Sequence, residues 1–84
     1  MQEKQLYAAI LHQAIEDLQL KQELRARGED WKKILVTDPE YYLFISKSGY
    51  PTSFNRICDL LNLNPDKVRQ GIMQNIYAKA LDNL

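Results

Sequence analysis

The chain has 84 residues, a length that suits one small domain. Eleven lysines and arginines balance eleven aspartates and glutamates, so the formal net charge is zero and a strongly basic coat protein is excluded. A hydrophobic fraction of 45% with three glycines and three prolines excludes a disordered chain, and we expect one folded domain over residues 1–84.

The first predicted element is an amphipathic helix over about residues 3–27. Past its apolar stripe, Lys21, Gln22 and Arg25 take the same helical angles, which predicts a weaker core contact there. Gly28 is expected to end the helix in the left-handed conformation. The apolar residues that fall within one half of the helical wheel are Leu6, Tyr7, Ile10, Leu11, Ala14, Ile15 and Leu18.

Two shorter helices are predicted next. Asp30 is a capping residue for a helix over 31–36, in which Trp31 is expected to anchor the core. Asp38, Pro39 and Glu40 then form a second start signal, which predicts a third helix to about Lys47. The apolar run 41–45 leaves a short buried strand as the alternative, and the capping residues favour the helix.

The last two predicted helices are separated by a short turn. Residues 48–51 form a turn by composition, in which Tyr50 and Pro51 are expected to pack on Trp31, and Thr52 or Ser53 caps the helix that follows. That helix breaks at residues 62–64, and Pro65 opens the last one. The predicted fold is therefore all-α, a compact bundle of four or five helices.

The strongest functional pattern is a helix-turn-helix-like pair over about residues 52–76. In that motif a first helix braces a second, whose early side chains reach base edges in the major groove. Cys58 supplies the small residue that the bracing helix needs, and Asn62 tolerates the geometry of the turn. Gly71 departs from the pattern, because an Ile or Val normally packs the second helix back at this point and Ile72 comes one place late.

The pattern predicts a set of DNA-contacting residues. Glutamine side chains pair with adenine edges, whereas lysine and arginine contact guanine or phosphate. An arginine in the bracing helix would clamp the DNA backbone. The alternative is an ordinary helical hairpin whose polar face is solvated. The predicted DNA-binding residues are Lys67, Arg69, Gln70, Gln74 and Arg56.

The order of several short strings resembles a group of small, mostly uncharacterised phage and prophage proteins. The strings are 14–18 (AIEDL), Trp31, Asp38 and 53–69 (SFNRICDLLNLNPDKVR). The resemblance covers most of the chain in order and includes no catalytic signature. It implies a compact helical protein of viral or integrated-element origin, with an expected role in gene control.

Other chemistry has little support in the sequence. His12 and Cys58 are the only imidazole and thiol, and they lie on different predicted helices, so we expect no metal site and no cofactor. A buried Cys58 with no second histidine as a base is a poor nucleophile, and no glycine-rich phosphate loop occurs. We therefore expect no enzymatic activity and no small-molecule substrate.

Cellular location follows from the same residues. A single cysteine forms no disulfide within the chain, and no basic start followed by a long apolar run occurs. The longest apolar runs are far shorter than the roughly 20 residues of a membrane span. We expect a cytoplasmic protein, in the bacterial host if the chain is phage-encoded, without a membrane segment.

Two functions from different classes remain. The first is regulatory DNA binding, expected to need a homodimer, because residues 47–84 hold five basic against three acidic side chains and are only mildly basic. The second is a small interaction module that binds or inhibits a host protein through the first helix, where Leu20 and Leu24 stray from the stripe. A part of a phage particle or packaging machine is a third interpretation.

Overall fold

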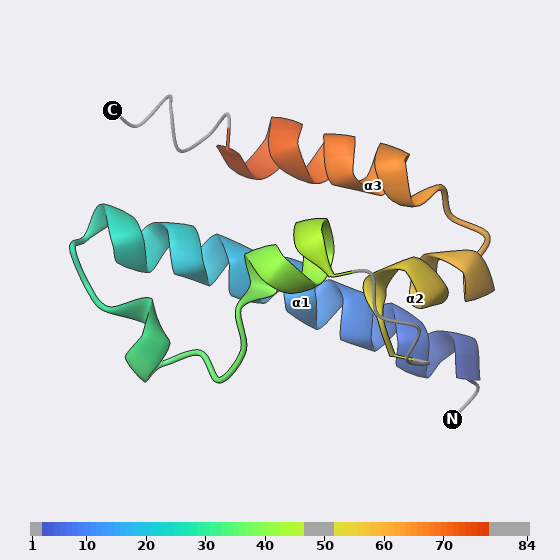
Figure 1. Ribbon diagram of the computed structural model, residues 1–84, viewed down its shortest axis with the longest axis horizontal. Helices are drawn as coiled ribbons and strands as arrows, with labels where there is room; N and C mark the ends of the chain where they lie inside the picture. The colour runs from blue at the N-terminus through green and yellow to red at the C-terminus, as the bar shows by residue number, and fades with distance from the viewer. Residues whose placement is uncertain (1–2, 47–51, 78–84) are drawn as a thin grey trace.

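The computed structural model describes residues 3–46 and 52–77, and every regular element within these ranges is helical (Figure 1). The predicted all-α bundle is confirmed. η1 is one turn of 3-10 helix, whereas η2 and η3 are π-helical turns, and η3 continues directly from α3. The elements in chain order are α1 (Glu3–Ala26), η1 (Trp31–Lys33), η2 (Tyr41–Ile45), α2 (Phe54–Leu60), α3 (Pro65–Ile72) and η3 (Met73–Tyr77).

α1 ends as its sequence predicts. Gly28 adopts a φ of 73°, in the left-handed region that glycine enters without a steric penalty. Its amide donates to the Arg25 carbonyl at 3.0 Å, and the Glu29 amide donates to the Leu24 carbonyl at 2.9 Å. These two bonds are the Schellman pattern, and they satisfy carbonyls that the helix end leaves without a partner.

The predicted helix over 31–36 is shorter than expected. Asp30 caps it, because its carboxylate accepts a hydrogen bond from the Lys32 amide at 3.1 Å, but the helix is limited to Trp31–Lys33. Ile34 is largely exposed and Val36 is fully exposed. Of the apolar side chains in the missing second turn, only Leu35 is even partly buried. The predicted role of Trp31 as a core anchor is also wrong, since this side chain is only half-buried and lies outside the core cluster.

Residues 39–45 form a helical segment, which we name the middle segment. Asp38 caps its start by accepting from the Glu40 amide at 3.0 Å, and Pro39 occupies the first position. The helix prediction is confirmed over the strand alternative. The segment ends when the Ser46 amide donates to the Tyr41 carbonyl at 2.8 Å, and the predicted end at Lys47 and the turn at 48–51 lie outside the described residues.

α2, a four-residue turn and α3 follow one another as the sequence predicts. Asn62 adopts a positive φ of 58° in the turn, where asparagine is tolerated better than most residues. Asn64 caps α3, because its side-chain oxygen accepts from the amides of Asp66 at 2.9 Å and Lys67 at 3.3 Å. Pro65 stands at the first helical position, where no amide donor is needed.

The core lies where α1, the middle segment, α2 and α3 meet. Ile72 takes the packing role that Gly71 leaves open, and a Cβ added to Gly71 would meet no atom within 4 Å. Tyr42 ties the middle segment to the start of α2, because its hydroxyl donates to the Thr52 carbonyl at 2.6 Å. The buried cluster consists of Leu11, Leu18, Leu43, Phe54, Ile57, Cys58, Ile72 and Ile76.

Candidate nucleic-acid interface

α3 runs along one edge of the molecule and rests on α2, which in turn rests on α1 (Figure 1). Ile57 and Cys58 on α2 and Ile72 at the end of α3 are buried in one cluster. Apolar contact therefore holds one face of α3 against its brace. The opposite face remains in solvent, as a helix packed on one side requires.

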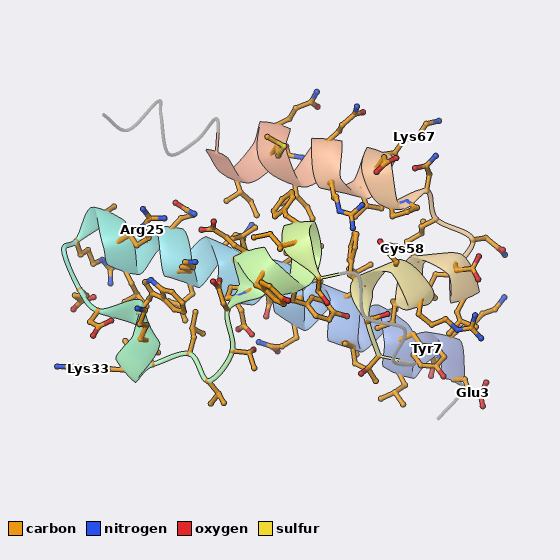
Figure 2. All side chains as sticks on the ribbon, viewed as in Figure 1. Glu3, Tyr7, Arg25, Lys33, Cys58 and Lys67 are labelled. Carbon is orange, nitrogen blue, oxygen red and sulfur yellow. The ribbon has the colours of Figure 1, made fainter. Side chains whose placement is uncertain are left out.

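Three of the predicted contact residues lie on this solvent face of α3 and its continuation. Lys67, Gln70 and Gln74 are all exposed. Lys67 points away from the body of the protein, near the start of α3 (Figure 2). We name these three side chains the outer face of α3. They bring one ammonium group and two amides together on one exposed surface.

Arg69 points inward from the same helix. Its Nε donates to the Leu43 carbonyl at 2.8 Å, and a terminal nitrogen donates to the Asn55 side chain at 2.8 Å. The guanidinium carbon lies 4.7 Å from the centre of the Phe54 ring, and Asp66 is an ion-pair partner at 3.3 Å. Only 21% of the side chain is exposed. The structure thus commits Arg69 to internal contacts, unlike the other predicted residues of α3.

Arg56 lies on α2 and is exposed. Its nearest acid is Asp59, one turn later, with 3.8 Å between the guanidinium nitrogen and the carboxylate oxygen. An exposed pair of this kind contributes well under about 1 kcal/mol, so the guanidinium stays available to another anion. The structure places Arg56 on the brace, separate from the outer face of α3.

Electrostatics on the interface are modest. Lys67 is the one cation of the outer face, and no acidic partner for it occurs among the residues that the structure describes. The neighbouring carboxylate of Asp66 is exposed and already paired with Arg69. Each phosphate contact adds one salt-dependent increment of affinity, so one copy of this face offers little.

A buried lysine on α1, Lys21, is not predicted by the sequence pattern. Lys21 is 5% exposed, and its Nζ lies 2.8 Å from Asp38 and 3.2 Å from Glu40. The same Nζ lies 4.1 Å from the centre of the Trp31 ring. Burial raises the pKa of Asp38, but the hydrogen bonds and charge of Lys21, with the Glu40 amide, outweigh it and hold that pKa below its ordinary value.

The position of Lys21 on the helical wheel of α1 was the sequence feature that could have predicted this network. It lies three residues after Leu18 and three before Leu24, both of which are buried, so it occupies the core face of α1. Gln22 donates to Glu40 at 3.0 Å, and Arg25 lies 3.6 Å from the same carboxylate. Past Leu18 no residue of α1 joins the apolar core cluster, as expected, and polar contacts replace apolar ones there.

This packing reduces the protein-binding surface that was predicted on the first helix. Leu24 is only 3% exposed, and Leu20 is half-buried. Leu24 therefore belongs to the packed side of α1 and offers no side chain to a partner. Of the two leucines, only the half-buried Leu20 still has part of its side chain exposed.

The imidazole and the thiol lie apart. His12 is exposed on α1 and lies 3.4 Å from Glu16, whereas Cys58 is fully buried on α2. Burial raises the pKa of the Cys58 thiol, and the charge of Arg69 opposes that effect. Within residues 3–46 and 52–77, no three side chains among His, Cys, Asp and Glu gather as metal ligands.

Two shallow cavities of about 330 and 250 Å³ adjoin one another on either side of Thr37 and Tyr42. Described residues lining them come from α1, from 37–46 and from Thr52 and Ser53, which directly precede α2. None of these lining residues belongs to α3. The outer face of α3 is thus separate from both cavities.

Comparison with protein-family models, with curated protein sequences and with solved structures finds no match to this chain. In the part of the chain that the structure describes, no helix is both long enough and apolar enough to cross a membrane.

Proposed function

We propose that the chain is a small DNA-binding regulator that places α3 in the major groove. The observation that carries the proposal is the outer face of α3, where Lys67, Gln70 and Gln74 stand in solvent on a helix braced by α2. A recognition helix needs both properties, since its early side chains read base edges while the brace holds its angle. The resemblance to small phage and prophage proteins agrees with a role in gene control.

Each exposed side chain has a role in this proposal. The amides of Gln70 and Gln74 match the donor and acceptor pair that adenine presents in the major groove. Lys67, near the start of the helix, contacts a phosphate or guanine, and Arg56 reaches the DNA backbone from α2. Arg69 is no longer among the contacts, because its nitrogens bond within the protein.

We further propose that two copies of the chain bind one site. A single outer face supplies one lysine and two glutamines, which is a small electrostatic contribution for a DNA-binding module. Two copies double the number of phosphate contacts and read two half-sites one helical turn apart. The bound sequence is then expected to be palindromic.

Fluorescence anisotropy with duplex fragments of the encoding genome tests the proposal between about 50 and 200 mM salt. Lys67→Glu is expected to abolish binding, and Lys67→Ala is expected to lower the salt slope by about two, roughly one for each copy on the site. Gln70→Ala and Gln74→Ala are expected to relax sequence preference more than affinity for unrelated DNA.

Lys33→Glu is the matched control. It changes the net charge by the same amount, and Lys33 is exposed at the end of the molecule opposite to Lys67 (Figure 2). Binding should survive this change. Equal losses for the two reversals, or no binding at low salt, would contradict the proposal. If the chain binds no DNA but recovers one host protein in stoichiometric amount, this result would favour the interaction module instead.

A further inference from the structure

We infer that Arg69 is a positioning residue that fixes the orientation of α3 on the rest of the protein. Its side chain touches α2 through Asn55 and Phe54 and the middle segment through Leu43. One residue of α3 therefore joins three elements. The consequence for DNA binding rests on the proposed function, whereas the effect on helix orientation does not.

The contact with Leu43 satisfies a backbone carbonyl that has no other partner among the described residues. The middle segment ends at Ile45, so the Leu43 carbonyl belongs to its last turn, where carbonyl groups have no amide partner within the helix. The Arg69 guanidinium supplies a hydrogen bond at 2.8 Å and a positive charge at the negative end of the helix dipole. Turning α3 away would break this hydrogen bond.

The contacts with α2 require the shape of arginine. The flat guanidinium lies over the Phe54 ring while its edge donates to Asn55. A lysine keeps the charge but has neither the planar group nor the fork of donors, so it makes one of these contacts at most. Arg69→Lys thus separates the charge of Arg69 from its geometry.

A distance measurement in the absence of DNA tests the orientation itself. Gln19→Cys on α1 and Gln70→Cys on α3 provide two exposed sites for spin labels, and the buried Cys58 is not expected to react. We expect a narrow distance distribution in the parent chain and a broader or shifted one after Arg69→Lys. Lys67→Ala should leave the distribution unchanged. An unchanged distribution in Arg69→Lys would overturn the inference.

Asn55→Ala covers the case in which Arg69→Lys does not fold. It removes one of the Arg69 contacts and leaves the Leu43 and Phe54 contacts in place. We expect the distance distribution of Asn55→Ala to be broader than that of the parent chain. If Arg69→Lys also folds, Asn55→Ala should show the smaller broadening of the two. A distribution identical to that of the parent chain would overturn the role of the guanidinium fork.

DNA binding separates positioning from charge. Arg69→Lys is expected to weaken affinity about tenfold with an unchanged salt slope, because no phosphate contact is lost. Affinity equal to that of the parent chain would show that Arg69 acts as a charge only, contrary to the inference. If the parent chain binds no DNA, the proposed function fails while the distance measurement still decides the role of Arg69.

Discussion

At the residue scale, Ser53 and Asn64 occupy the same position at the starts of two neighbouring helices, and their side chains behave differently. The Asn64 oxygen accepts from two amides of α3. The Ser53 hydroxyl is buried at the start of α2. It caps no amide of that helix and makes no hydrogen bond with any other described group. The asparagine side chain therefore caps its helix, whereas the serine side chain does not.

This difference predicts unequal effects of substitution by alanine at the two positions. Asn64→Ala should lower the free energy of unfolding by about 1 kcal/mol, because two amides lose their acceptor. Ser53→Ala should change it by less than about 0.5 kcal/mol or raise it, because a buried hydroxyl without a partner disappears. Urea denaturation of the two variants measures both effects. Equal losses would contradict the assignment of the two side chains.

Asp38 makes stability depend on pH. Its folded-state pKa lies below the ordinary value of about 3.9, so its contribution is full above that value and is lost as the pH falls through the folded-state pKa. Asp38→Asn is therefore expected to unfold more easily at neutral pH and to approach the parent chain as the pH falls through the folded-state pKa of Asp38. Thermal unfolding at several pH values checks this, and a constant difference would refute it.

At the element scale, the two described glycines impose different requirements on their helices. Gly71 lies inside α3 with open space around its Cα, whereas Gly28 ends α1 with a positive φ. Gly71→Ala should stabilise the protein by about 0.5 to 1 kcal/mol, because alanine favours the helix. Gly28→Ala should destabilise it by about 1 kcal/mol. Thermal unfolding of both variants tests the pair, and loss of stability in Gly71→Ala would indicate a contact with that helix face.

The helix boundaries were the part of the fold most accessible to sequence reasoning. The signals at Asp30, Asp38 and Pro65 act over one turn, and the structure uses each where the sequence places it. Asn62 was also predicted, because a turn between two apolar helices needs a residue that tolerates positive φ. Such signals depend on neighbours in the chain and not on the tertiary fold.

The candidate site was less predictable, because the direction of a long polar side chain depends on distant residues. Arg69 and Lys67 lie two positions apart on α3, yet one bonds to Leu43 and Asn55 and the other stands in solvent. Lys21 forms ion pairs with carboxylates that lie 17 and 19 residues later in the chain. Periodicity places these residues on a face of a helix, but it does not show what that face meets.

At the scale of the whole molecule, the thiol of Cys58 reports on global unfolding. The side chain is fully buried where α1, α2 and α3 pack together, and burial raises its pKa, so both access and reactivity are low in the folded state. We expect an aromatic disulfide reagent to modify Cys58 at a rate that follows the unfolded population as urea is added. Rapid modification without denaturant would show that the core opens locally.

The middle segment depends on the rest of the chain for both of its ends. Lys21 from α1 binds the carboxylate that caps its start, and Arg69 from α3 binds the carbonyl near its finish. A helix of this length is too short to form alone in water. Excised as a peptide, residues 37–46 should therefore show no helical circular dichroism, and during folding this stretch should become ordered only after the flanking helices have docked.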